Sequence, residues 1–331
     1  MVRMKHWSRI GLAAGALLTI AAATALAQQS YPVRPVHIVL PMPAGGAMDA
    51  LARALGQKFQ ERTGQPLVVE NKPGGNTLIA ASACKNANSD GYTLCLLTTS
   101  SISINPELYK KLPYQPEKDF EPVTQLAVAN SIIILSKKVP ANNLAELVKY
   151  SQENPDKLNY ASFGVGGDSH LVIEWLKKKT GLKATHVPFR GGAPAMMAFE
   201  AGSVQMLLLI VGNANLPERI AKGEVTGLLV PGDRRIPQAP NVPTFKEAGL
   251  PTFESRTWFG VFAPAGTPKP VVDKVQSEIA SVINVPEFRD RMLTPHGFNP
   301  VGSRPDDFKS FLLKDRANGR ELVEISGVRI E

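Results

Sequence analysis

A glycine-rich turn between an apolar run and an amphipathic stretch is the feature that most constrains what this chain can fold into. Val36 to Leu40 form a short apolar run, which Pro41, Gly45 and Gly46 end. From Ala50 to Phe59 apolar residues then recur at helical spacing. The pattern predicts a buried parallel strand that leads through a tight turn into the N-terminus of a helix, which is the repeating unit of α/β proteins.

The same turn suits the binding of a small anion. Gly45 and Gly46 have no side chains to shield the backbone, so free N–H groups can point at a ligand. The dipole of the following helix adds partial positive charge at the same place. No Lys-Ser or Lys-Thr follows the glycines, which excludes a phosphate loop. An ordinary strand-to-helix turn without a ligand is the alternative.

Strand and helix patterns alternate along the rest of the chain, and glycine-rich turns recur between them. This predicts an α/β fold, and the break in the pattern between residues 120 and 130 predicts a second unit from Ser131 onward. The predicted strands lie at 67–71, 92–97, 131–135, 159–162 and 204–207, glycine-rich turns at 72–77, 163–170 and 186–195, and helices at 143–150, 171–178, 269–282 and 305–313. A length of 331 residues also favours two domains.

Two further turns place polar side chains near predicted strand ends. Ser100 and Ser101 follow a strand, where the hydroxyls either line the ligand crevice of an open α/β sheet or cap the next helix. Arg190 stands beside the turn that precedes Gly191 and Gly192. Arginine binds carboxylates in a bidentate manner, so Arg190 is either a ligand contact or a solvent-facing side chain.

No catalytic set emerges from the reactive residues. Gly167-Asp168-Ser169 matches the Gly-Asp-Ser of one esterase class, but it lies in the middle of the chain and no late Asp-x-x-His accompanies it. Asp168, Ser169 and His170 are adjacent on one helical turn, so their side chains diverge and cannot form a nucleophile–base–orienter chain. The five histidines have no metal-ligand spacing and no dinucleotide fingerprint occurs. We therefore expect no catalytic residue, metal or cofactor.

The N-terminus has the pattern of a secretory signal peptide. Arg3, Lys5 and Arg9 precede an Ala-rich apolar run that ends at Ala27, and the mature chain is predicted to begin at Gln28. A membrane anchor fits less well, because the run is short and rich in Ala and Gly. Removal of the leader, with its three basic and no acidic residues, lowers the net charge from +8 to +5. Basic residues form no runs interleaved with aromatics, so we expect no nucleic-acid partner.

The two cysteines flank a predicted turn. Cys84 lies at the end of a helical pattern, Cys95 lies in the next strand, and Asp90-Gly91 between them is a turn signal. The two sulfur atoms can therefore meet, and an oxidising compartment favours a disulfide. Two buried thiols are the alternative.

Taken in order, several short motifs resemble the Bug family, the TctC-type substrate-binding proteins of tripartite tricarboxylate transporters. The resemblance covers essentially the whole mature chain. It rests on Pro41-x-Pro43-Ala44-Gly45-Gly46-x-x-Asp49, Glu70-Asn71-Lys72-Pro73-Gly74-Gly75, Asp90-Gly91-Tyr92-Thr93-Leu94, Asn105-Pro106-x-Leu108-Tyr109, Leu112-Pro113-Tyr114, Ser169-His170-Leu171, Val187-Pro188-Phe189-Arg190-Gly191, Asn241-Val242-Pro243-Thr244-Phe245 and Trp258-x-Gly260.

The resemblance implies a two-domain periplasmic binding protein that closes on a small carboxylate and delivers it to membrane transport subunits. It also implies that the turn from Pro43 to Asp49 holds a ligand carboxylate and that the turns at 100–101 and 166–170 face it. Together with Arg190, the predicted ligand-binding residues are Met42, Pro43, Ala44, Gly45, Gly46, Asp49, Ser100, Ser101, Gly166, Asp168, Ser169 and His170.

The predicted division places residues 28–130 and 251–331 in one domain and residues 131–250 in the other, and we expect a monomer. One departure from the family concerns residues 208–213, where many members carry an aspartate near the cleft. Leu208, Leu209 and Ile210 stand there in this chain. The sequence therefore predicts an apolar wall that disfavours a ligand ammonium group; a change buried in packing, without ligand contact, is the alternative.

Two other functions compete with the receptor. An extracytoplasmic hydrolase or isomerase on the same scaffold would use Ser169 and His170. A sensory receptor would present its loaded form to a signalling partner.

Overall fold

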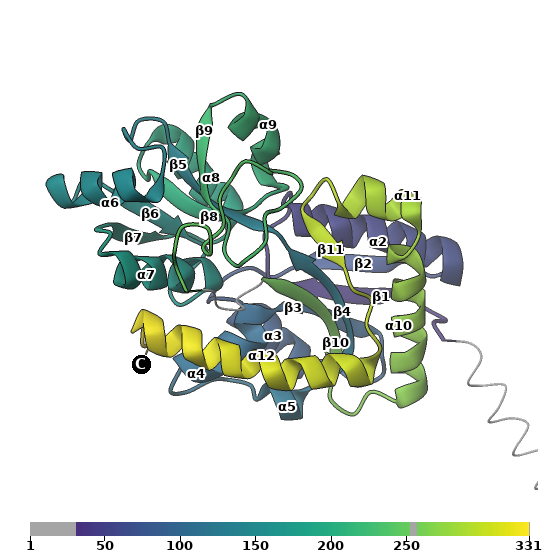
Figure 1. Ribbon diagram of the computed structural model, residues 1–331. Helices are drawn as coiled ribbons and strands as arrows, with labels where there is room; N and C mark the ends of the chain where they lie inside the picture. Colours follow the sequence, from purple (N-terminus) through teal and green to yellow (C-terminus); the bar gives the residue numbers. More distant parts are fainter. Residues whose placement is uncertain (1–30, 252–256, 331) are drawn as a thin grey trace, which may run out of the picture.

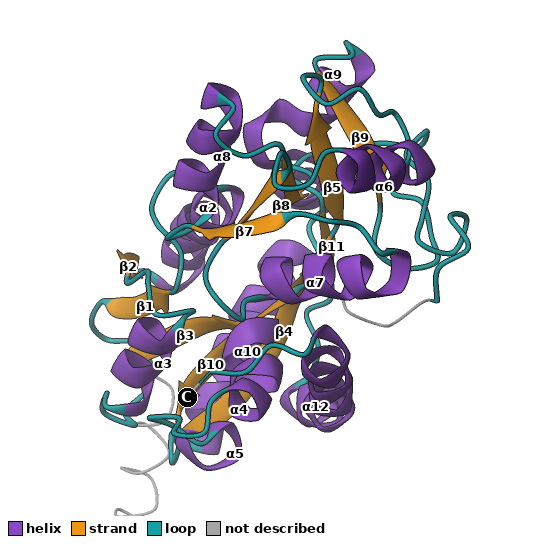
Figure 2. Ribbon diagram, turned by 90° about the vertical axis from the view of Figure 1, so that its left-hand side faces the viewer, coloured by secondary structure: helices purple, strands orange, loops and turns teal. Residues whose placement is uncertain are grey.

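The computed structural model describes residues 31–251 and 257–330, which form two α/β halves around two mixed sheets (Figure 1). The first sheet has the strand order β11-β4-β10-β3-β1-β2 and the second has the order β7-β6-β8-β5-β9. Helices flank both sheets, as the view turned by 90° also shows (Figure 2). The predicted fold class, two α/β units with helices around each sheet, is confirmed.

The first sheet combines parallel and antiparallel strands. β1 (Val36–Leu40) runs parallel to both β2 (Leu67–Asn71) and β3 (Thr93–Thr98). β10 (Trp258–Pro264) lies antiparallel between β3 and β4 (Phe120–Ala129), and β11 (Phe298–Pro300) extends the edge. The helical elements of this half are α2 (Ala47–Thr63), α3 (Leu78–Lys85), the π-helix η1 (Ser100–Ile104), α4 (Asn105–Leu108), α5 (Pro116–Asp119), α10 (Lys269–Ile283), α11 (Pro286–Phe288), η3 (Arg289–Leu293) and α12 (Pro305–Ser326).

The second sheet also combines parallel and antiparallel strands. β6 (Asn159–Ser162) is parallel to β7 (Thr185–Pro188) and β8 (Met206–Ile210), whereas β5 (Ser131–Ser136) is antiparallel to β8 and β9 (Val225–Leu229). Its helices are α6 (Leu144–Glu153), α7 (Asp168–Thr180), α8 (Gly192–Ala201), η2 (Asn213–Asn215) and α9 (Leu216–Ala221). Asn143 caps α6 by accepting from the N–H of Glu146, as its position predicted.

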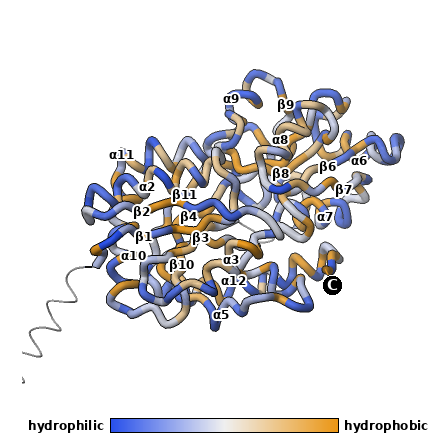
Figure 3. Tube along the Cα trace, turned by 180° about the vertical axis from the view of Figure 1, so that it is seen from behind, coloured by the Kyte–Doolittle hydropathy of each residue, from blue (hydrophilic) through white to orange (hydrophobic). Residues whose placement is uncertain are grey.

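The apolar strand patterns become the cores of the two halves. Hydropathy mapped on the chain places hydrophobic residues along the central strands (Figure 3). In β1 the side chains of Val36, Ile38 and Leu40 are fully buried, and in β5 those of Ile132 and Ile134 are as well. Strands buried on both faces read as continuous apolar runs, which explains why the sequence pattern located them.

The chain passes from the first sheet to the second between β4 and β5, at Asn130. The predicted return of the chain from the second domain to the first falls partly on residues 252–256, which lie outside the described residues. The predicted leader, residues 1–27, also lies outside them. The exact domain bounds stay a prediction. α12 extends well beyond the predicted 305–313 and contacts η1 and β4 of the first half and also α7 of the second (Figure 1). The last helix therefore bridges the halves instead of packing on the first alone.

Glycines of the second half make close contacts with the first. Gly191 has a φ of +115°, and a Cβ added to it would lie 2.9 Å from the ring of Pro43. A Cβ on Gly166 would lie 2.0 Å from Leu108 Cδ2. Glycine at these positions allows the two backbones to approach each other.

A buried stack of rings holds the turn between β6 and α7. The rings of His170 and His186 lie with their centroids 3.7 Å apart, and Tyr160 stacks on His186 at 5.0 Å. The N–H of Gly166 donates to His170 Nδ1 over 2.9 Å, and Ser162 Oγ lies 2.6 Å from His186 Nε2. The hydrogen bond from Gly166 to His170 therefore attaches the glycine-rich turn to this stack.

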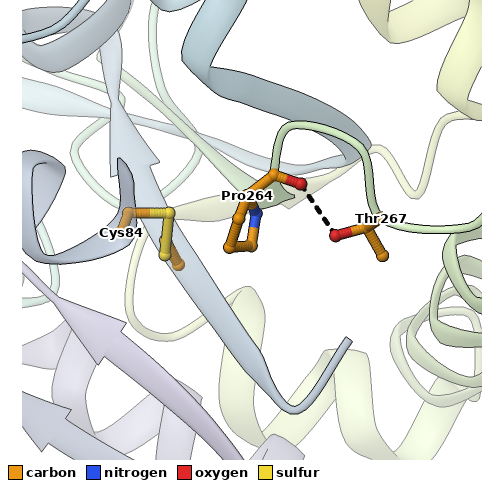
Figure 4. The surroundings of a disulfide bond; sticks show 4 residues. Cys84, Pro264 and Thr267 are labelled. Atoms are coloured by element: carbon orange, nitrogen blue, oxygen red, sulfur yellow. Dashed lines mark hydrogen bonds between the residues drawn. A yellow bond between two sulfur atoms is a disulfide. The ribbon is translucent and has the colours of Figure 1, made fainter. Parts of the chain in front are cut away.

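Cys84 of α3 and Cys95 of β3 form the predicted disulfide, which ties the helix to its following strand. Both residues are fully buried in an apolar cluster with Phe262. Figure 4 shows the bond near Pro264 at the end of β10, whose carbonyl accepts a 2.7 Å hydrogen bond from the Thr267 hydroxyl. The disulfide thus stabilises the strand that leads to Ser100.

Reduction of this disulfide should lower the free energy of unfolding by about 3 kcal/mol, because the loop that it closes gains conformational entropy in the unfolded chain. Denaturant unfolding with and without reductant measures the effect. The Cys84→Ala/Cys95→Ala variant serves as the control and should not respond to reductant. Ligand binding should survive reduction. Two free thiols in the mass spectrum of the unreduced protein would contradict the bond.

The histidine stack predicts a dependence of stability on pH. Burial, followed by the positive field of His186 and Lys177, lowers the pKa of His170 to about 4, although Glu174 opposes the shift. In the unfolded chain this group takes up a proton below pH 6.5. Acid therefore favours unfolding, and the free energy of unfolding should fall by roughly 3 kcal/mol between pH 6.5 and pH 4.

Denaturant unfolding across this pH range should show a shallower slope for His170→Gln, because the amide takes up no proton there. A His296→Gln variant removes a histidine from outside the stack and serves as the matched control. Equal slopes for parent and His170→Gln would show that His170 does not carry the effect.

Candidate functional site

A cavity of about 230 Å³ lies between the two halves, where several strand ends and helix starts meet. The first half contributes the turns after β1 and β2, the end of β3, η1 and the start of β10. The second half contributes the turns before α7 and α8, together with β8 and η2. The lining residues are Pro41, Met42, Pro43, Ala44, Gly46, Ala47, Met48, Asp49, Pro73, Gly74, Gly75, Asn76, Thr77, Thr98, Ser100, Ser131, Phe163, Gly164, Gly167, Asp168, Ser169, Phe189, Arg190, Gly191, Gly192, Ala193, Leu208, Ile210, Asn213, Thr257 and Phe259.

Three helices begin at this cavity with glycine at the N-cap. Gly46 precedes α2, Gly167 precedes α7 and Gly191 precedes α8, and none of these caps supplies a side-chain hydrogen bond. The first N–H groups of a helix have no acceptor within the helix, and a side-chain cap ordinarily satisfies one of them. The first N–H groups of α2 and α7, those of Ala47 and Asp168, donate to Asn213 Oδ1 and Ser100 Oγ. An anion here would use the N–H groups that follow them and the positive ends of the helix dipoles.

Asp49 lies in the first turn of α2, and hydrogen bonds from neighbouring residues compensate its negative charge. Its Oδ1 accepts from Arg53 Nη2 at 3.0 Å and from Asn71 Nδ2 at 2.9 Å, and its Oδ2 accepts from the Gly45 N–H and from Arg53 Nε, both at 3.0 Å. Burial alone raises the pKa of Asp49, but the hydrogen bonds from Arg53, Gly45 and Asn71 hold it below its usual range. The carboxylate therefore shapes the turn and is not a free base.

Three hydrogen bonds join the halves at the edge of the cavity, one of them from the Asp168 N–H to Ser100 Oγ at 3.4 Å. The Thr257 hydroxyl donates to Asp168 Oδ2 at 2.6 Å, and the Ala47 N–H donates to Asn213 Oδ1 at 3.3 Å. Asp168 opens α7 and Thr257 precedes β10, while Ala47 opens α2 and Asn213 lies in η2. The helix starts that face the cavity are thus also the places where the halves touch.

Most of the predicted ligand-binding residues come together at the cavity. Met42, Pro43, Ala44, Gly46, Asp49, Ser100, Asp168, Ser169 and Arg190 line it, and Gly45, Ser101, Gly166 and His170 do not. The hydroxyl of Ser101 points instead to Thr77 Oγ1, at 2.9 Å. Gly45 and Gly166 direct their N–H groups to Asp49 and His170, and the ring of His170 packs on His186. Whether the lining residues bind a ligand stays a prediction.

Several lining residues lie outside the predicted ligand-binding set, and two of them belong to the predicted apolar wall. Leu208 and Ile210 of β8 face the cavity, whereas the intervening Leu209 packs into the core of the second half. This alternation places the departure from the family pattern at the cavity wall and not only in packing. Phe163 and Phe189 precede two of the glycine-rich turns, and Asn213 follows β8. These three residues lie just after strand ends, and that position was the sequence signal that could have identified them as lining residues.

Ser169 and His170 do not form a nucleophile–base pair. Ser169 Oγ accepts from the N–H of Phe163 at 3.1 Å, and His170 Nδ1 accepts from the N–H of Gly166. Across residues 31–251 and 257–330, no group of three or more His, Cys, Asp or Glu side chains could hold a metal ion. Within the same residues, no helix is long and apolar enough to cross a membrane.

Known proteins resemble this chain in both sequence and structure. It is 34% identical over 313 residues to the UPF0065 protein in the tcbD-tcbE intergenic region of Pseudomonas sp. strain P51, covering 94% of this chain and 92% of the relative. The periplasmic binding protein BugD superposes with a TM-score of 0.84 at 33% identity, over 91% of this chain and all of BugD. R. palustris Rpa4515, solved with adipate, gives 0.84 at 30% identity, over 90% and 99%.

The family model of the tripartite tricarboxylate transporter family receptor matches residues 51–328. The resemblance to TctC-type and Bug proteins is therefore confirmed, and the chain belongs to the tripartite tricarboxylate transporter receptor family.

Proposed function

We propose that this protein is a periplasmic receptor that binds a small carboxylate reversibly and delivers it to the membrane subunits of a tripartite transporter. The observation that carries the proposal is the cavity between the halves, at which α2, α7 and α8 each begin with a glycine N-cap. A carboxylate placed there accepts from backbone N–H groups of both halves and gains from the helix dipoles.

The relatives support this proposal. Rpa4515 was solved with adipate, a dicarboxylate, and it shares the fold over nearly all of both chains. The predicted leader, with cleavage after Ala27, supports export to the periplasm. The receptor acts as a monomer and needs no cofactor in this proposal. A sensory role would use the same ligand site with a different membrane partner.

The hydrogen bonds of Ser169 and His170 favour a binding role over a hydrolase or isomerase. Ser169 Oγ and His170 Nδ1 each accept from a backbone N–H, and in the described residues no hydrogen bond joins the two side chains as a nucleophile–base pair requires. Both residues stabilise the turn before α7. We therefore assign them no catalytic step.

A thermal-shift screen of the mature protein against mono-, di- and tricarboxylates should give reversible stabilisation by at least one compound. Binding to the folded state alone raises stability by about 2.7 kcal/mol at 100 times the dissociation constant. Product analysis of each hit should recover the compound unchanged. Methyl esters of the same acids serve as matched neutral controls and should not stabilise the protein. Chemical conversion of a stabilising acid would refute the receptor assignment.

Substitution of Gly46 should weaken carboxylate binding without unfolding the protein. The φ of Gly46 is −84°, and an added Cβ would have no heavy atom within 4 Å, so a side chain fits the fold and points into open space. Gly46→Val should obstruct the anion position and reduce affinity by at least about tenfold in calorimetry, a loss of about 1.4 kcal/mol.

Gly46→Ser sharpens this test, because a serine at the N-cap accepts from the same N–H groups that the ligand needs. It should leave the free energy of unfolding unchanged or raise it by a few tenths of a kcal/mol, while still weakening binding. Circular dichroism checks the fold of both variants. Parent-like affinity, together with parent-like compaction on ligand addition in X-ray scattering, would show that the turn does not bind the carboxylate.

A further inference from the structure

We infer that Asn213 and Ser100 favour closure of the two halves before any ligand is bound, because each caps a helix that begins on the opposite half. The closed form is the one in which the halves touch as described above. Closure is then partly a property of the protein itself, and a ligand adds to it. The inference goes beyond the proposed function, since it concerns the protein without a ligand.

The first support is the cap of α2. Its N-cap residue, Gly46, supplies no side-chain hydrogen bond. The first N–H of the helix, that of Ala47, donates instead to Asn213 Oδ1 over 3.3 Å. Asn213 belongs to η2 of the second half, and asparagine is among the residues that cap helices best. A side chain of the second half therefore does for α2 what its own N-cap residue cannot do.

The backbone of η2 presents this side chain to the first half. Ala214 and Asn215, which follow Asn213, have φ values of +53° and +50°. This left-handed region is rarely adopted by residues other than glycine, and it persists where surrounding contacts determine it. The hydrogen bond from Ala47 to Asn213 is one such contact. The sharp turn of η2 is thus connected to the start of a helix on the other half.

The second support is the cap of α7, which has the opposite direction. Its N-cap residue, Gly167, also supplies no side-chain hydrogen bond. The N–H of Asp168 donates over 3.4 Å to the hydroxyl of Ser100, a buried residue at the start of η1 in the first half. Asp168 Oδ2 also accepts the Thr257 hydroxyl of the first half. Two hydrogen bonds from Asp168 therefore hold the start of α7 against the first half.

The two caps are reciprocal, and separation of the halves breaks both. Glycine has no side chain that could replace either cap in an open form, so the two N–H groups would then face water. Both bonds join protein groups and need no ligand. They are longer than the common length of about 2.9–3.0 Å, so we expect each to favour closure by only about threefold.

Spin labels that report the distance between the halves test the inference without a ligand. Cysteines in place of the exposed Lys58 of α2 and Lys222 of α9 carry the labels, since Cys84 and Cys95 are joined in the disulfide. Native mass spectrometry checks that the labelled protein carries no ligand. Pulsed electron paramagnetic resonance then gives the ratio of closed to open form. The parent should contain the closed form under these conditions.

Alanine variants assign the ratio to the two caps. Asn213→Ala and Ser100→Ala should each lower the ratio of closed to open form about threefold, and the double variant about tenfold. Asn142→Ala and Ser310→Ala, at exposed residues outside the cavity, are the matched controls and should leave the ratio unchanged. Circular dichroism checks the fold of each variant.

Asn213→Asp separates capping from a general effect of substitution at this position. Aspartate caps helices as well as asparagine does, and its charge is favourable at a helix N-terminus. The ratio of closed to open form should therefore stay at the parent value or rise. A ratio as low as that of Asn213→Ala would show that Asn213 does not act as a cap.

Two further results would overturn the inference: a parent that shows only the open distance, or alanine variants that keep the parent ratio. The parent and Asn213→Asp decide the question even where an alanine variant does not fold. None of these measurements uses a carboxylate. If no carboxylate stabilises the protein in the thermal-shift screen, the proposed function fails, whereas this inference depends on the distance measurements alone.

Discussion

The site depends on the neutralisation of one buried carboxylate. Asp49 lies in the first turn of α2, where a bare negative charge would repel an anionic ligand and lose its own hydration. Arg53 one helical turn later, Asn71 at the end of β2 and the Gly45 N–H together satisfy it. Asn71 also donates to the Met42 carbonyl at 3.1 Å, so one network fixes the turn from both sides. The glycine turn can expose its N–H groups because this network holds its shape.

The second constraint is that the backbones of the two halves approach each other closely. A Cβ on Gly191 would meet Pro43, and one on Gly212 would lie 2.2 Å from the backbone of His296. The first contact lies at the cavity and the second lies near the passage between the sheets, where the Asn130 N–H donates to the Gly297 carbonyl at 2.7 Å. Side chains at these positions would hold the halves apart. Donors from both halves can then no longer reach one small ligand.

The elements that carry the site could be predicted from sequence because each is local. An apolar run that ends at Pro and Gly located β1, the Asp90-Gly91 turn signal marked the start of β3, and the glycine-rich turn after Ser162 marked the end of β6. The turn signal between Cys84 and Cys95 located the disulfide. The antiparallel insertion of β10 could not be predicted, since its partners β3 and β4 lie more than a hundred residues away. Ser101 and His170 carry plausible ligand groups, but neighbours that only the fold brings together, Thr77 and His186, engage them. Side-chain direction at a strand end is decided by such neighbours and not by spacing.

The glycine N-caps lower the stability of the three helices slightly, but they leave space for a ligand that contacts both halves. A glycine N-cap costs only a few tenths of a kcal/mol relative to serine, so three of them are a small loss for a core of this size. In the proposed function a bound carboxylate would accept from further N–H groups at these helix starts, and it could contact α2 and α7 together only when the halves are as close as the Ala47–Asn213 and Asp168–Thr257 hydrogen bonds hold them. In an open form the same anion meets one helix start and the remaining donors face water. If the receptor closes on a carboxylate as we propose, the differential affinity that favours closure comes from backbone groups, and closure is then a general response to carboxylates.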